Sequence, residues 1–173
     1  CPLGTFGAEE GKGACESCPL GTFADEEGAE TCASCPLGTF ANEEGSATCR
    51  ACPLGTFQDD EGKASCVSCP KGAFAGDEGA ETCASCPLGM FTNETGTARC
   101  APCPKGSFAD AEGAEFCVSC PAGAFAEAEA SASCAPCAPG SFQNATGASV
   151  CVSCPLGTFS TAAAATRCST CPA

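Results

Sequence analysis

Apolar and polar positions along the chain repeat with a period of 17 residues. The typical copy begins with Cys-Pro, continues through a short apolar segment such as Leu-Gly-Thr-Phe, passes an acidic stretch that ends in Gly, and closes on a second cysteine. Cys137 alone of the ten first cysteines is followed by Ala, and the last two copies lack the acidic residues. Gly, Pro and Cys recur too often for an apolar face of helical period to form. The pattern therefore predicts two very short strands per copy, such as 21–23 and 29–32, joined by a turn into a hairpin.

The repeat keeps its frame without insertion or deletion, so residues 1–170 are interpreted as ten tandem copies and 171–173 as the start of an eleventh. This frame, and a start at cysteine without Met, lead us to expect an excerpt of a longer chain. The first cysteines of the copies are Cys1, Cys18, Cys35, Cys52, Cys69, Cys86, Cys103, Cys120, Cys137 and Cys154, with Cys171 opening the eleventh. The second cysteines are Cys15, Cys32, Cys49, Cys66, Cys83, Cys100, Cys117, Cys134, Cys151 and Cys168.

Three parts of the copy, position 4, position 6 and positions 8 to 11, carry conformational information. Position 4 is Gly in every full copy, which predicts a positive φ or a close approach by another segment. Position 6 is always Phe, the one large apolar side chain common to all ten copies, and we expect each unit to bury it. Positions 8 to 11, as in 25–28, match a type I turn. Ala130 and Ala164 replace the turn glycine in two Ala-rich copies, and we interpret both as variant turns rather than helix.

Composition shows what must hold such a chain together. Hydrophobic residues make up 44% of the sequence, but most are Ala or Cys, and Trp, Tyr and Ile are absent. With a net charge of −14, that composition would leave the chain disordered unless its 21 cysteines cross-link it. An isolated hairpin is marginally stable, so neighbouring copies must also stack. We predict a small disulfide-rich repeat protein, an elongated solenoid-like rod of short β-hairpins without a large hydrophobic core.

Charge and residue content exclude several functions. Seven Lys and Arg against 21 Asp and Glu make nucleic acid and anionic membrane surfaces poor partners. No apolar run reaches the length of a membrane span. The chain has no His and no Tyr and only four Lys, and its few Ser and Thr have no base partner, so we predict that it is not an enzyme.

Two metal hypotheses stay open as minority alternatives to a protein without a cofactor. The spacing of Cys15, Cys18, Cys32 and Cys35 comes close to a four-cysteine zinc site, although the repeat shows no pairing of copies that such sites would impose. Most acidic residues fall at positions 8 to 10 and would form an acidic ridge in a stack. Carboxylates are suitable calcium ligands, but no turn has the ligand alternation of a dedicated calcium loop.

The motif Cys-Pro-Leu-Gly-Thr-Phe-x4-Gly-x3-Cys-x2-Cys, repeated from Cys1 to Cys171, resembles the cysteine-rich repeats called ephrin-receptor-like and the first half-module of tumour-necrosis-factor-receptor ectodomains. Phe replaces the Tyr that is usual in those families. The resemblance implies an extracellular or cell-surface location, no catalysis, a disulfide between the first and second cysteine of each copy, and an elongated rod. The long regular array is similar to those of algal and protist surface proteins, including mastigoneme-type flagellar hairs.

Two N-glycosylation sequons begin at Asn93 and Asn144, both at position 8 of a copy, where a turn tip would leave a glycan free. The leading functional hypothesis is a structural component of an extracellular filament, stalk or surface appendage, whose partners are copies of itself or other filament proteins. The alternative is a receptor or adhesion ectodomain, in which the array displays a binding head outside this segment.

Overall fold

A computed structural model describes residues 1–7 and 14–172. It confirms a disulfide-rich repeat of short β-hairpins, with no helix among the described residues. The strands at positions 5 and 6 of the copies are β1 Thr5–Phe6, β3 Thr22–Phe23, β5 Thr39–Phe40, β7 Thr56–Phe57, β9 Ala73–Phe74, β11 Met90–Phe91, β13 Ser107–Phe108, β15 Ala124–Phe125, β17 Ser141–Phe142 and β19 Thr158–Phe159. Those at positions 16 and 17 are β2 Glu16–Ser17, β4 Ala33–Ser34, β6 Arg50–Ala51, β8 Val67–Ser68, β10 Ala84–Ser85, β12 Ala101–Pro102, β14 Val118–Ser119, β16 Ala135–Pro136, β18 Val152–Ser153 and β20 Ser169–Thr170.

The second strand of each hairpin lies further along the chain than the sequence pattern predicted. In the second copy, Thr22 pairs with Ser34 and Phe23 with Ala33 in an antiparallel register, so the strand follows the second cysteine instead of preceding it. The predicted strand 29–32 belongs to the long loop between the two strands. Its hydrogen-bonding capacity is used elsewhere, since the Ala29 carbonyl accepts from the Gly7 amide of the preceding copy at 3.0 Å.

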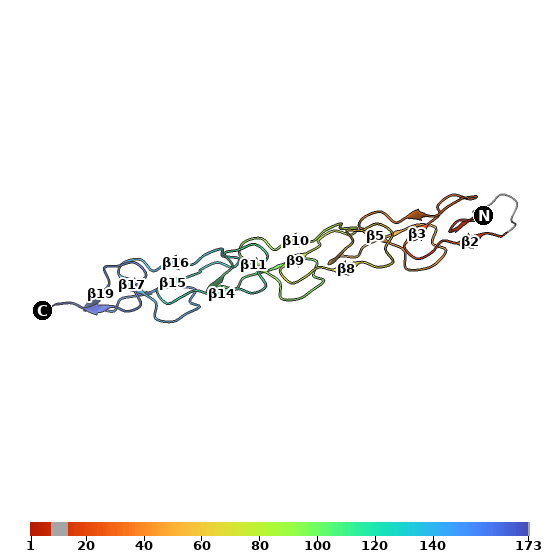
Figure 1. The fold of residues 1–173 in the computed structure, drawn as a ribbon. Coiled ribbons are helices and arrows are strands. Elements are labelled where there is room, and N and C mark those ends of the chain that lie inside the picture. The colour runs from red at the N-terminus through yellow and green to blue at the C-terminus, as the bar shows by residue number, and fades with distance from the viewer. Residues whose placement is uncertain (8–13, 173) are drawn as a thin grey trace. The chain divides into compact units, whose positions relative to one another are not determined.

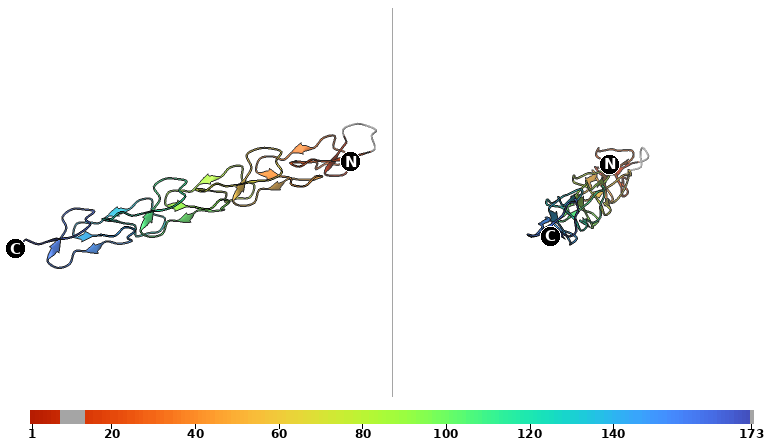
Figure 2. Two further views of the ribbon diagram at one scale, coloured as in Figure 1. Left: turned by 60° about the horizontal axis from the view of Figure 1, so that its bottom comes forward. Right: turned by 90° about the vertical axis from the view of Figure 1, so that its left-hand side faces the viewer.

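The chain divides into two compact units. Unit 1 comprises Cys1–Ala84 and Thr95–Arg99, and unit 2 comprises Ser85–Glu94 and Cys100–Ala173. Inside each unit the hairpins follow one another in chain order, and no hairpin extends into a larger sheet (Figure 1). The left-hand view of Figure 2 shows the same succession within each unit from a further direction.

Backbone hydrogen bonds tie each copy to the next. Between copies 2 and 3, the Gly21 amide donates to the Ala41 carbonyl at 2.8 Å and the Gly45 amide donates to the Cys18 carbonyl at 2.8 Å. The Cys35 amide of copy 3 also donates to the Gly21 carbonyl of copy 2, at 2.9 Å. Because a two-stranded hairpin satisfies few of its own backbone groups, these bonds between copies supply what a broader sheet would otherwise provide.

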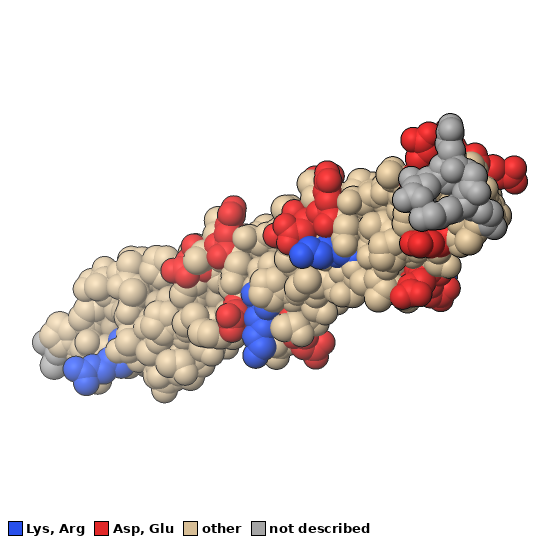
Figure 3. All heavy atoms as spheres, turned by 45° about the vertical axis from the view of Figure 1, so that its right-hand side comes forward, with Lys and Arg blue, Asp and Glu red and all other residues tan. Residues whose placement is uncertain are grey.

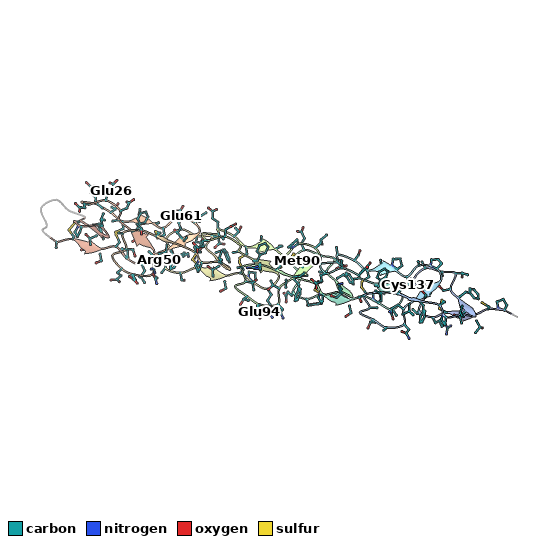
Figure 4. All side chains as sticks on the ribbon, turned by 180° about the vertical axis from the view of Figure 1, so that it is seen from behind. Glu26, Arg50, Glu61, Met90, Glu94 and Cys137 are labelled. Atoms are coloured by element: carbon teal, nitrogen blue, oxygen red, sulfur yellow. A yellow bond between two sulfur atoms is a disulfide. The ribbon has the colours of Figure 1, made fainter. Side chains whose placement is uncertain are left out.

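Copies two apart also touch directly. A Cβ added to Gly21 would collide with the backbone carbonyl of Gly62, which belongs to the acidic turn two copies later. Even-numbered copies therefore form one row within a unit and odd-numbered copies another. Glu26 and Glu61, from copies 2 and 4, lie on the same edge of unit 1 (Figure 4). The single acidic ridge expected from the period is thus wrong for unit 1, because alternate copies present their turns in separate rows.

The residues that each copy buries are small. The first cysteines of copies 2 to 9 have no exposed surface, and position 7, as in Ala24 or Ala41, is also buried. The position 6 phenylalanines are only partly buried, and Phe159 is exposed. The expectation that each unit buries its Phe is therefore met only in part, because the two-stranded hairpin has no second sheet to cover the ring.

Candidate functional site

A disulfide joins the first and second cysteine of every full copy, with Cα atoms 5.3 to 5.8 Å apart. These are the pairs that the family resemblance implies. They are Cys1–Cys15, Cys18–Cys32, Cys35–Cys49, Cys52–Cys66, Cys69–Cys83, Cys86–Cys100, Cys103–Cys117, Cys120–Cys134, Cys137–Cys151 and Cys154–Cys168. Cys171 is free and exposed. The zinc hypothesis fails because all four of its sulfurs are committed to disulfides and cannot act as thiolate ligands.

Cys35 shows how three copies meet at a first cysteine. The amide of Cys35 donates to Gly21 of the copy before, and its carbonyl accepts from Gly62 of the copy after at 2.8 Å. Its side chain is fully buried, as are the other first cysteines of copies 2 to 9. A thiolate can attack a disulfide only where it can reach a sulfur, so in copies 2 to 9 the burial shields one sulfur of each bridge from exchange.

The turn before the first strand explains the Gly-Thr pair in the repeat. The Thr22 amide donates to the Pro19 carbonyl at 3.1 Å, and the Thr22 hydroxyl donates to the same oxygen at 2.7 Å. Gly21 has a φ of +80°, as required at the third residue of a type II turn. Position 4 has positive φ in all ten copies, and the collision described above shows that the predicted close approach exists as well.

The turn at positions 8 to 11 closes differently from the predicted type I hairpin turn. Gly28 has positive φ, but its amide donates to the Cys1 carbonyl of the preceding copy at 2.8 Å. Ala130 and Ala164 have φ values of +56° and +59°, which confirms that both are variant turns and not helix. Their amides keep the same bond to the preceding copy, at 2.9 Å.

Acidic side chains at these turns are exposed to solvent (Figure 3). Over residues 1–7 and 14–172, no three Asp, Glu or Cys side chains gather as a metal site would require. Lys63 contacts Asp60 at 3.2 Å across two exposed side chains, a pairing that contributes little to stability. Positions 8 to 10 of the first copy, with Glu9 and Glu10, lie outside the described residues.

Asn93 and Asn144 are both exposed at the start of a turn, and so are the sequon hydroxyl residues Thr95 and Thr146. The residue before each Asn is buried and polar, a feature that the sequence pattern did not reveal. Gln143 donates from its amide to the Val150 carbonyl at 2.9 Å and accepts from the Ala145 amide at 3.0 Å, which braces the loop from inside. Gln58 makes the equivalent pair of bonds in copy 4.

A hollow of about 290 Å³ lies on copy 3, beside the loop that carries Asn42 and Glu43 and the strand that carries Arg50. It is lined by a single copy, and these three side chains are exposed. The described part of the chain contains no helix long and apolar enough to cross a membrane.

Comparison with known families gives five overlapping matches to one family, described as tyrosine-protein kinase ephrin type A/B receptor-like. The matched segments are 1–31, 21–63, 55–98, 93–133 and 123–171. No curated protein matches the chain. Repeats of this family are typically non-catalytic. Membership of this family and the ten disulfides of the chain together point to an extracellular or surface location. Since the matches tile the chain from its first residue to residue 171, the chain belongs to the ephrin-receptor-like family of cysteine-rich repeats.

Proposed function

We propose that the chain is a structural component of an extracellular filament, stalk or surface appendage, a disulfide-laddered rod that spans distance and assembles with copies of itself or with other filament proteins. The observation that carries this proposal is the use of each copy's backbone. Backbone groups at positions that recur in the repeat, such as the Gly21 and Gly45 amides and the Cys18 carbonyl, bond to adjacent copies. A unit whose invariant residues serve stacking is built for length, and it can be extended by adding units.

A receptor or adhesion ectodomain is the second candidate, favoured by the family that the chain matches. In that case the array would hold a binding head, located outside this segment, away from the cell surface. The two functions make the same demands on the array itself. They differ in whether the arrays pack against one another.

Electron microscopy of the native material separates the two candidates. We expect a regular lattice or fibre, labelled along its length by an antibody raised against residues 18–172. The acidic turns are suitable epitopes for this antibody, because they face solvent in the isolated chain. Isolated thin particles that each carry a globular head would contradict the filament proposal and favour the receptor.

An extracellular location also makes the sequons accessible to glycosylation, and we propose that Asn93 and Asn144 carry N-glycans. Secreted from a eukaryotic host, the protein is expected to lose mass on treatment with peptide N-glycosidase, by the equivalent of two glycans. Asn93→Gln and Asn144→Gln should each remove one of them. Intact-protein mass spectrometry measures both results.

Copy 3 offers a matched control for glycosylation. Asn42 is exposed at the same position 8, but Glu44 stands where a sequon needs Ser or Thr. Wild-type Asn42 should be unmodified, and Glu44→Thr should add a third glycan. If Glu44→Thr is glycosylated while Asn93 and Asn144 are not, the turn accepts glycans and the proposal for the two natural sites is wrong.

A further inference from the structure

Two copies of unit 2 differ from the rest in what they expose. At positions 14 and 16, copy 7 carries Phe116 and Val118, and copy 9 carries Val150 and Val152. These side chains are 70%, 46%, 56% and 51% exposed, respectively. In no other full copy are both positions occupied by large apolar residues, because Ala, Ser, Thr, Arg or Glu stands at one or both. Exposed apolar side chains that cluster, rather than scatter singly, mark interaction surfaces.

The two side chains of each pair stand two residues apart in the chain and are exposed to solvent. Phe116 and Val150 lie in a bend, and Val118 and Val152 begin the strands that follow, β14 and β18. The residue between them is the second cysteine, Cys117 or Cys151, which is joined by its disulfide to Cys103 or Cys137. Phe116 with Val118, and Val150 with Val152, are therefore two exposed apolar pairs.

The stacking of copies brings copies 7 and 9 into contact. A Cβ added to Gly106 of copy 7 would collide with the backbone carbonyl of Gly147 of copy 9. Gly147 of copy 9 lies on Ser119 of β14, with the added Cβ position 3.7 Å from the serine Cβ, and its amide donates to the Cys120 carbonyl at 2.8 Å. The loop of copy 9 that leads to Val150 thus starts against the strand that carries Val118. We name Phe116, Val118, Val150 and Val152 the apolar patch.

Charge determines what this patch can meet. Copy 9 has no charged residue, and no Asp or Glu follows Glu129 in the sequence. Two chains of net charge −14 repel each other, and they can approach most closely where the acidic turns are missing. A basic partner would instead be drawn to the acidic turns of unit 1, such as that of Asp59 and Asp60. Copy 7 carries Asp110, Glu112 and Glu115. An arrangement that sets copy 7 of one chain against the uncharged copy 9 of another avoids opposing acidic turns, and this favours a second molecule of the same chain.

We infer that the apolar patch is a self-association surface, at which unit 2 of one chain contacts unit 2 of another. A two-fold arrangement of two chains sets Phe116 of one chain against Val150 of the other, and the reverse contact follows by symmetry. This inference rests on the proposed structural function and names the surface that would serve it.

Sedimentation velocity on the full chain, produced without glycans, tests the inference. We expect reversible self-association at concentrations of about 10 to 500 μM, which Phe116→Ser/Val150→Ser weakens by at least 30-fold, roughly the loss from uncovering four apolar side chains in a symmetric pair. Serine is the natural residue at position 14 of copies 4 and 8, Ser65 and Ser133, so this variant is expected to fold. Val118→Ala/Val152→Ala should act in the same direction.

The matched control removes two exposed apolar side chains elsewhere. Leu54→Ala/Leu88→Ala should leave the association unchanged, since neither leucine belongs to the apolar patch. Both leucines are about half-exposed (49%), and Ala122 stands at the same position of copy 8, so this variant is also expected to fold. Raising the salt concentration should strengthen the association, because it screens the repulsion between acidic chains. Three results would each overturn the inference: weakening of the association by salt, equal effects of Phe116→Ser/Val150→Ser and Leu54→Ala/Leu88→Ala, or a monomer at all concentrations. An association that ignores the patch variants would leave the proposed function standing, and electron microscopy tests that function independently.

Discussion

Full reduction and alkylation of the ten disulfides is expected to unfold the chain. Each disulfide closes a loop of about 15 residues, for which the chain-entropy estimate of stabilisation is about 3 kcal/mol. The other buried residues are Gly, Ala and a few Ser, Thr and Gln, and they provide too little apolar area to order a chain of this charge. Amide hydrogen exchange followed by mass spectrometry should show that the amides bonded between copies, including Gly45 and Gly62, lose their protection together.

Two controls define this result. Alkylation without reduction should modify Cys171 alone and leave protection intact, since the other 20 cysteines are in disulfides. EDTA should also leave the fold unchanged. Protection that survives reduction would show that stacking alone holds the copies together. Unfolding by EDTA alone would show that a bound metal supplies the stability assigned here to the disulfides.

Gly38→Ala is expected to destabilise unit 1 by about 3 kcal/mol or more, whereas Gly79→Ala should cost only about 1 kcal/mol. Both glycines have positive φ, +71° and +75°. The difference lies in the space around them. A methyl group on Gly38 would collide with the backbone carbonyl of Gly79, and copies 3 and 5 would have to separate. A methyl group on Gly79 would meet Ala51 at an ordinary 3.6 Å.

Urea unfolding of the two variants, under oxidising conditions, measures the difference. The chain contains natural precedents for the milder change, because Ala130 and Ala164 occupy the same turn position with positive φ. A reversion, Ala130→Gly, should stabilise unit 2 by up to about 1 kcal/mol. Equal losses for Gly38→Ala and Gly79→Ala would show that backbone conformation alone fixes both glycines, and that the contact between copies two apart has no energetic weight.

The sequence by itself determined the repeat unit and its local conformation. An unbroken 17-residue frame, Gly at position 4 and the near absence of large aliphatic residues were enough to predict short hairpins, a positive φ at Gly21 and its equivalents, and order that depends on disulfides. These features follow from restrictions within a few residues of the chain. The two Ala-containing turns were predicted correctly for the same reason, since the frame left Ala130 and Ala164 no room to extend into a helix.

Only the tertiary structure decided how the copies meet. The second strand lies at positions 16 and 17, and the loop carbonyls bond to the preceding copy, because hydrogen bonds between copies compete with those inside a hairpin. The buried positions proved to be the first cysteine and position 7 rather than Phe, since a ring on a two-stranded hairpin has no layer above it. The contact between Gly21 and Gly62, 41 residues apart, is invisible in the period. The equivalent contact between Gly106 and Gly147 in unit 2 brings copies 7 and 9 together, because neighbours in space are here two copies apart in sequence.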